Sequence, residues 1–153
     1  MKTEKRALFR EERGVEIIEF AFVIPLLALL LAGGIEFGRA FYTYNILTKS
    51  VRNATRYAAD TIISPAARIP TDCVDKAKRV AVYGNVTGGA KIIPDISETN
   101  FDVTAAAGSA ANEFYVTVSA NYPYSPIFQF LLPSANFKPK VTMIFTGYVS
   151  GSV

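Results

Sequence analysis

The stretch ERGVEIIEFAFVIPLLALLLAGG, residues 12–34, combines a membrane-spanning composition with charges that a lipid bilayer disfavours. Residues 15–35 are apolar except for Glu16 and Glu19. As a helix this run spans about 31 Å, which matches the hydrocarbon core of a bilayer. An acidic side chain at the edge of such a span indicates a functional role and a partner of opposite charge. The stretch therefore predicts a transmembrane helix over residues 15–36 with two carboxylates at its start.

The segment before this span, residues 1–14, is short and mainly basic, with five basic and three acidic side chains. A cleaved secretory signal also has a charged start followed by an apolar run. The run here is long for a signal, carries acids at its front and precedes no small-residue cleavage motif. We therefore expect a membrane anchor. The basic residues on the N-terminal side favour a cytoplasmic N-terminus, although Arg39, Lys49 and Arg52 follow the span.

Beyond the span, residues 37–63 continue the helix with an amphipathic pattern. Apolar side chains recur every three or four residues, as one stripe of an α-helix requires. The members of this stripe are Phe37, Phe41, Tyr44, Leu47, Val51, Ala54, Ala58 and Ile62. The sequence therefore predicts one helix over residues 15–62, about 70 Å long, with a stripe that a small domain covers.

Composition restricts the chemistry of the chain. The sequence contains no histidine and a single cysteine, Cys73. Without histidine the usual general base and the usual zinc ligand are missing, so an ordinary hydrolase is not expected. We also expect no catalytic residue, no cofactor and no metal site. A lone thiol leaves a buried small side chain or an intermolecular link, and we favour burial. Outside residues 1–14, 11 basic residues face 10 acidic ones, so no nucleic-acid partner is expected.

Residues 64–153 are expected to form a small extracytoplasmic domain. A second helix is predicted over residues 72–83, with Thr71 or Asp72 as its N-cap and Gly84 as its stop. Alternating apolar residues predict strands at 101–103 and 114–122, joined by a loop in AAGSAAN, residues 106–112. A β-rich apolar run predicts a further strand at 141–149. The predicted fold class is α+β: a long transmembrane-to-amphipathic helix, a short helix and an antiparallel sheet of three to four strands.

The segment PYSPIFQFLLPSANFKP, residues 123–139, is more apolar than a solvent-exposed loop requires. Its apolar side chains include Ile127, Phe128, Phe130, Leu131 and Leu132. The simplest interpretation is a flap that covers one edge of the core. The alternative is a contact surface for another protein subunit.

Gly14 followed by Val15, with Glu19 and Phe20 beyond it, resembles the processing site of a type IV prepilin. In that class a membrane-embedded prepilin peptidase cuts after the glycine, and the fifth residue of the mature chain is a glutamate. Cleavage here would create a positively charged amine on Val15. Glu19 lies about one helical turn away and is an available partner, within its own chain or in a neighbour.

The resemblance extends over about residues 13–60, which look like the TadE-like family of pseudopilins of the Flp or tight-adherence pilus. Beyond Glu19-Phe20 it rests on Pro25 before a leucine run, on Gly34-Ile35-Glu36-Phe37-Gly38 and on Ala54-Thr55-Arg56-Tyr57-Ala58-Ala59. It implies a minor pilin of the bacterial inner membrane that acts in pilus assembly or initiation, in adhesion or in secretion. The implied partners are the prepilin peptidase, other pilins through the N-terminal helix, the inner-membrane assembly platform and membrane lipid.

For several residues the sequence leaves two interpretations open. Glu19 is either an assembly residue, with Phe20 and Pro25, or an acid that extends to the lipid headgroups; Glu16 is expected in the headgroups. Gly34 and Gly38 permit close helix packing, either between subunits or on the chain's own domain. A membrane-anchored binding or scaffold module outside any filament remains an alternative for the whole protein, as does a secreted enzyme.

Overall fold

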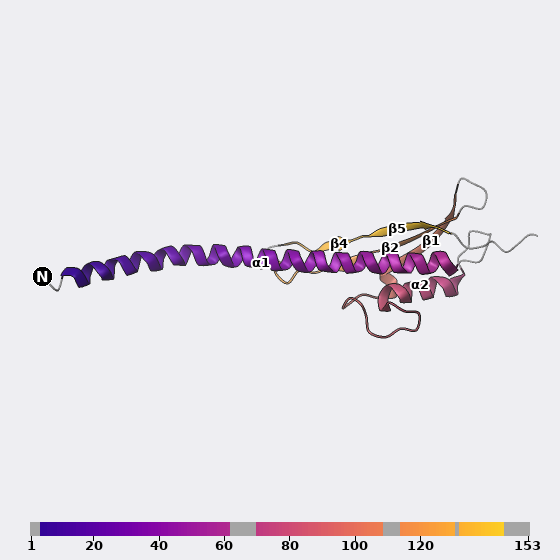
Figure 1. Cartoon of the computed structure of the whole chain (residues 1–153), viewed down its shortest axis with the longest axis horizontal. Helices are drawn as coiled ribbons and strands as arrows, with labels where there is room; N and C mark the ends of the chain where they lie inside the picture. Colours follow the sequence, from indigo (N-terminus) through magenta and orange to yellow (C-terminus); the bar gives the residue numbers. More distant parts are fainter. Residues whose placement is uncertain (1–3, 62–69, 109–113, 131, 146–153) are drawn as a thin grey trace, which may run out of the picture.

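One long helix that carries a small α+β domain along its C-terminal half makes up the fold (Figure 1). The computed structural model describes residues 4–61, 70–108, 114–130 and 132–145, with side chains from Gly14 onward. Its elements are α1 (Glu4–Thr61), α2 (Thr71–Tyr83), the 3₁₀ turn η1 (Glu98–Asn100), β1 (Phe101–Ala107), β2 (Phe114–Ala120), β3 (Tyr122–Tyr124), β4 (Ala135–Phe137) and β5 (Lys140–Ile144). The predicted α+β class and its order of elements are confirmed.

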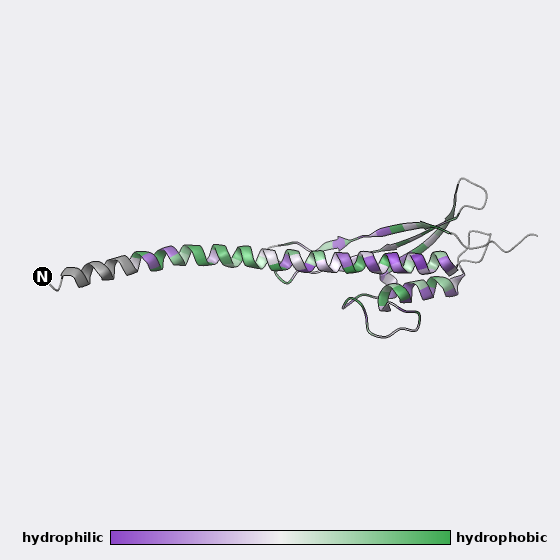
Figure 2. Cartoon of the chain, viewed as in Figure 1, coloured by the Kyte–Doolittle hydropathy of each residue, from purple (hydrophilic) through white to green (hydrophobic). Residues whose placement is uncertain are grey.

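Helix α1 contains 58 residues and is about 87 Å long. It begins at Glu4, so the prediction that the helix starts at residue 15 is wrong. The leader is rich in Lys, Arg, Glu, Ala and Leu, which favour helix, and a single Gly14 costs only about 1 kcal/mol. The helix continues through Pro25 and bends gently in this apolar half (Figure 1). Figure 2 shows the change from a uniformly apolar helix to one with alternating polar and apolar residues.

The domain covers the predicted stripe of α1 only from Leu47 onward. Leu47, Val51, Ala54 and Ala58 have no exposed surface. By contrast, Phe37 is 70% exposed and Phe41 is 61% exposed, so the prediction that the domain covers them is wrong. Tyr44 is also exposed, and Ile62 lies outside the described residues.

Helix α2 packs beside the second half of α1. Pro70 occupies the N-cap position and no side chain caps the helix, so the predicted N-cap at Thr71 or Asp72 is wrong by one or two residues. Proline is compatible with this position because it has no backbone N–H to satisfy. Gly84 ends the helix as predicted: its φ of 76° is left-handed, and its N–H donates to the carbonyl oxygen of Val80.

The main sheet is antiparallel with strand order β1-β2-β5. Its register places Val118 between Val103 and Val141, and Val116 opposite Met143. The predicted strand 114–122 is divided, because Tyr122 belongs to β3, which pairs only with β4. Pro123 explains the division, since a proline has no N–H to donate in a central strand. The described part of the predicted strand 141–149 ends at Ile144, and residues 146–149 lie outside the described range.

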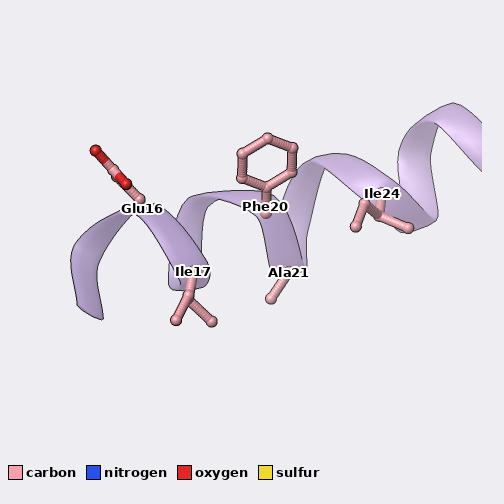
Figure 3. A pocket seen from close by; sticks show the side chains of 5 residues that line it. All are labelled: Glu16, Ile17, Phe20, Ala21 and Ile24. Atoms are coloured by element: carbon pink, nitrogen blue, oxygen red, sulfur yellow. The ribbon is translucent and has the colours of Figure 1, made fainter. Parts of the chain in front are cut away.

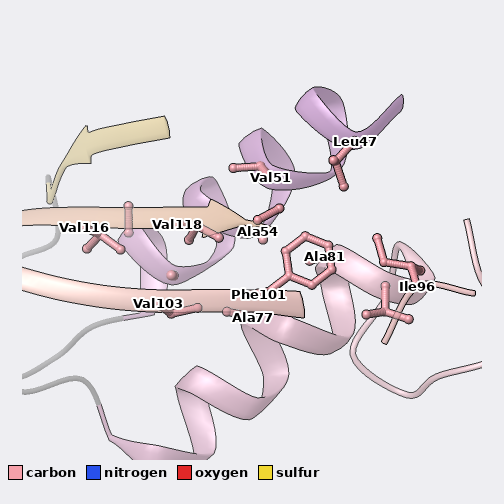
Figure 4. Packing of buried hydrophobic residues seen from close by; sticks show 14 of the residues in the cluster. Leu47, Val51, Ala54, Ala77, Ala81, Ile96, Phe101, Val103, Val116 and Val118 are labelled. Atoms are coloured by element: carbon pink, nitrogen blue, oxygen red, sulfur yellow. The ribbon is translucent and has the colours of Figure 1, made fainter. Parts of the chain in front are cut away.

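The core lies where α1, α2 and the main sheet meet (Figure 4). Its helical part is made largely of small residues, and its strands contribute larger ones. The buried members include Leu47, Val51, Ala54, Ala58, Ala77, Ala81, Ile96, Phe101, Val103, Val116 and Val118. The alanines let the two helices approach closely, and the buried Ser50 hydroxyl donates to the carbonyl oxygen of Ala81 across that contact. Cys73 is free and buried, as predicted.

The burial of β2 predicts that two adjacent positions differ in how well they tolerate a charged side chain. Val116 has no exposed surface, whereas Thr117 is part-exposed and lies 2.8 Å from the Thr142 hydroxyl. Val116→Asp should unfold the domain, because it places an unpaired charge in the core. Thr117→Asp should be much milder. The measurement is limited proteolysis of the full chain in detergent, and equal resistance of the two variants would show that the strand register is wrong.

Candidate functional site

The predicted processing and assembly residues lie on the exposed apolar half of α1. Gly14 is inside the helix, and a Cβ added there would meet no neighbouring atom within 4 Å. Val15, Phe20 and Pro25 are likewise exposed, as is every residue from 14 to 31. The described residues contain one helix that is long and apolar enough to cross a membrane, Gly14–Thr61. This half of α1 therefore presents its whole circumference to lipid or to other helices.

Glu16, Glu19 and Phe20 border a shallow hollow on this helix together with Val23. Figure 3 shows Glu16 and Phe20 projecting from one side of the helix, while Ile17, Ala21 and Ile24 project from the adjacent side. Among the side chains that the structure describes, neither carboxylate has a hydrogen bond or an ion pair. Glu19 is thus exposed and available to a partner outside the described side chains.

Gly34 and Gly38 lie side by side on the exposed surface of α1. A Cβ at either position would meet nothing within 4 Å. They do not pack against the chain's own domain, so that alternative is wrong. Packing between subunits stays a prediction for this pair.

Glu36, in the same Gly34–Gly38 segment, is fully buried and joins α1 to the domain. Its Oε1 accepts a 2.6 Å hydrogen bond from the Tyr124 hydroxyl, at the end of β3. Its Oε2 accepts the backbone N–H of Ile127 at 3.1 Å. Arg39, one turn further along α1, forms an ion pair with Oε1 at 3.2 Å. A buried carboxylate requires such partners, and here they come from α1 itself and from the segment that ends β3.

Arg39 and a set of aromatic rings extend this contact. Its guanidinium donates to the carbonyl oxygen of Ser125 at 2.5 Å and lies 4.9 Å from the centre of the Tyr124 ring. Tyr124 stacks on Phe137 of β4, and Phe137 meets the ring of Tyr44 edge-on. Burial, with the hydrogen bond to Glu36, raises the pKa of Tyr124, so its hydroxyl remains a donor at neutral pH.

Sequence reasoning assigned Glu36 no role of its own. It appeared only as part of a motif at the end of the span. The available signal was the spacing of Glu36 and Arg39, which places opposite charges on one face of a helix at the membrane exit. The partner Tyr124 lies 88 residues away, and no local pattern connects the two.

Residues 14–56 match the family model described as TadE-like protein. The matched range contains the apolar half of α1, Glu36 with Arg39, and most of the stripe that the domain covers. It confirms the resemblance drawn from the sequence. No curated protein and no solved structure matches this chain.

The hydrogen bonds at Glu36 predict how substitutions that remove them change the stability of the domain. Tyr124→Phe removes one hydrogen bond and should lower the free energy of unfolding by about 1 kcal/mol. Glu36→Ala should be more damaging, because it leaves the Tyr124 hydroxyl and the Ile127 N–H without their acceptor. Hydrogen exchange of the full chain in detergent measures the effect at Ile127. Glu16→Ala, an exposed change on the same helix, is the control, and equal protection in the Glu36 and Glu16 variants would contradict the assigned contact.

Proposed function

We propose that this protein is a minor pilin or pseudopilin of a Flp or tight-adherence type pilus, processed by a prepilin peptidase after Gly14. The observation that carries the proposal is the match of residues 14–56 to the TadE-like model on a helix whose apolar half is exposed around its full circumference. Such a helix is suited first to a bilayer and then to a bundle of like helices. The protein acts by assembly or initiation of the filament and has no enzymatic activity.

The proposed membrane topology is a single pass through the bacterial inner membrane. Residues 1–14 form the leader, residues 15–36 the span, residues 37–63 the amphipathic continuation and residues 64–153 the extracytoplasmic domain. The excess of basic residues in the leader supports a cytoplasmic N-terminus. The domain's attachment along the second half of α1 supports an extracytoplasmic location beside the membrane exit.

Glu19 is the proposed assembly residue. After cleavage the new amine of Val15 is positively charged near neutral pH. Glu19 is exposed and without an ion pair among the described side chains, so its carboxylate is available to the amine of its own chain or of a neighbour. In a low-dielectric environment this attraction is far stronger than in water. It aligns a new subunit in the membrane, and the assembly platform and other pilins are its partners.

A membrane-anchored scaffold that never enters a filament is the second candidate, because the same helix serves as a plain anchor. The intact mass of the mature protein separates the two. A chain that begins at Val15 supports the pilin, and an uncut chain supports the anchor.

Gly14→Leu should leave the leader attached. The peptidase has to approach the backbone at this residue, and a branched side chain would occupy the space that glycine leaves open. Mass spectrometry of the protein from cells with the peptidase measures the outcome. Ala21→Leu, on the same helix beyond the cut, should mature normally. Normal maturation of the Gly14 variant would refute the assigned site.

Glu19→Gln should be inserted and cut but should not enter or initiate the filament. The substitution keeps the shape of the side chain and removes its charge, so the Val15 amine is left unpaired at a cost of about 3–5 kcal/mol for a buried pair. Glu16→Gln is the matched control and should have much less effect. Pilus yield and subunit incorporation are measured, with cleavage checked by mass. Normal incorporation of Glu19→Gln would reduce Glu19 to an acid that extends to the headgroups.

A further inference from the structure

The loop that follows β3, residues 125–130, exposes large apolar side chains. Ile127 is 64% exposed and Phe130 is 80% exposed, so these side chains do not cover the core and the flap interpretation is wrong for them. Phe128 contacts the Phe130 ring edge-on, and its carbonyl oxygen accepts the N–H of Leu132. The loop is thus an ordered turn that presents apolar tips outward.

The position of this loop along α1 is fixed by the contact at Glu36. Ile127 donates to Glu36, and Ser125 accepts from Arg39. Glu36 is the last residue of the predicted span and follows its apolar part directly, so its Cα lies about 1.5 Å beyond that of Ile35 along the helix. In Figure 1 the region between β3 and β4 lies at the end of the domain nearest the apolar half of α1. The loop is therefore held at the level where the helix leaves the hydrocarbon.

Aromatic side chains of α1 lie at the same level. Phe37 and Phe41 stack on one side of the helix with their ring centres 6.4 Å apart. They lie about 3 Å and about 9 Å beyond Ile35 along the axis. Tyr42, also exposed, projects from another flank, about 100° around the helix from Phe41. The headgroup region of one leaflet is about 5–8 Å thick, so these side chains fall within it or at its outer boundary.

We propose that residues 125–130, together with Phe37, Phe41 and Tyr42, form a membrane-surface contact that rests in the outer interfacial region of the bilayer. Interfacial segments bury apolar side chains about 5–10 Å into the boundary between headgroups and acyl chains. Aromatic residues also concentrate at this depth in membrane proteins. The occupant of the surface is lipid, because the Glu36 contact ties the loop to the membrane exit whether or not another subunit is present. The inference depends on the membrane-spanning helix alone and not on cleavage or filament assembly.

The chain contains no tryptophan, so single substitutions provide local reporters of depth. The full-length protein is placed in nanodiscs with one chain per disc, made of phosphatidylcholine with acyl chains brominated near the glycerol end. Phe130→Trp should lose most of its emission relative to the unbrominated lipid and should emit at shorter wavelength than in denaturant. Leu27→Trp, inside the span, should also be quenched. Ile144→Trp, half exposed on β5, which runs away from the membrane exit, should keep its emission (Figure 1).

The outcomes distinguish this proposal from the proposed function. A quenched Leu27→Trp with an unquenched Phe130→Trp would overturn the membrane-surface contact alone and would leave the membrane anchor intact. An unquenched Leu27→Trp would overturn both the contact and the membrane anchor. Equal quenching at Phe130 and Ile144 would show that the domain lies flat on the bilayer and would also overturn the contact through the loop.

Discussion

The continuity of α1 is the constraint on which the rest of the structure depends. Because one helix runs from Glu4 to Thr61, each position in the sequence corresponds to a fixed height along a single axis. The apolar half fixes where the bilayer lies, and the amphipathic half fixes where the domain attaches. Glu36 lies between these two halves. Its carboxylate accepts hydrogen bonds from Tyr124 and Ile127 of the domain.

At this boundary the buried Glu36 lies on the face of α1 that the domain covers, whereas Phe37, the next residue, lies about 100° around the helix and is exposed. The network of Glu36, Arg39 and Tyr124 fills the space beside α1 that an apolar stripe would otherwise occupy. Phe137, stacked on Tyr124, then continues the contact to the edge of the Tyr44 ring, and the aliphatic core follows only from Leu47. A polar contact of this kind has directional partners, so it fixes the position of the β3–β4 region along the helix more sharply than apolar contacts alone.

Local patterns in the sequence predicted most of the secondary structure. The apolar run predicted the first helix, and the alternation of Val116 and Val118 predicted the buried face of β2. The start of α1 was misjudged because the leader before Gly14 has good intrinsic helix propensity. The division at Tyr122 was missed because the alternating pattern continues into Pro123, where the hydrogen bonding of a central strand does not.

The candidate functional residues also divide into those that local sequence patterns predicted and those that they did not. Glu19 and Gly14 are visible in the sequence because their meaning depends on neighbours within a few residues. The role of Glu36 was not predictable, because its partners Tyr124 and Ile127 come from a distant segment and approach it only after the domain has packed on α1. The apolar stripe of α1 was predicted, but the part of it that the domain covers was not. The periodicity of a helix does not show where a covering domain ends.

The length of α1 has a mechanical consequence. From residue 37 to residue 61 the helix is about 37 Å long; the contacts of Glu36 and Arg39 hold its beginning against the domain, and α2 and the main sheet brace it from Leu47 onward. Transmembrane helices tilt by about 20° on average, and a tilt of that size would carry the far end of this part of the helix sideways by about 13 Å. For a given tilt, the β1–β2 end of the sheet therefore moves further sideways than the contact at Glu36 does.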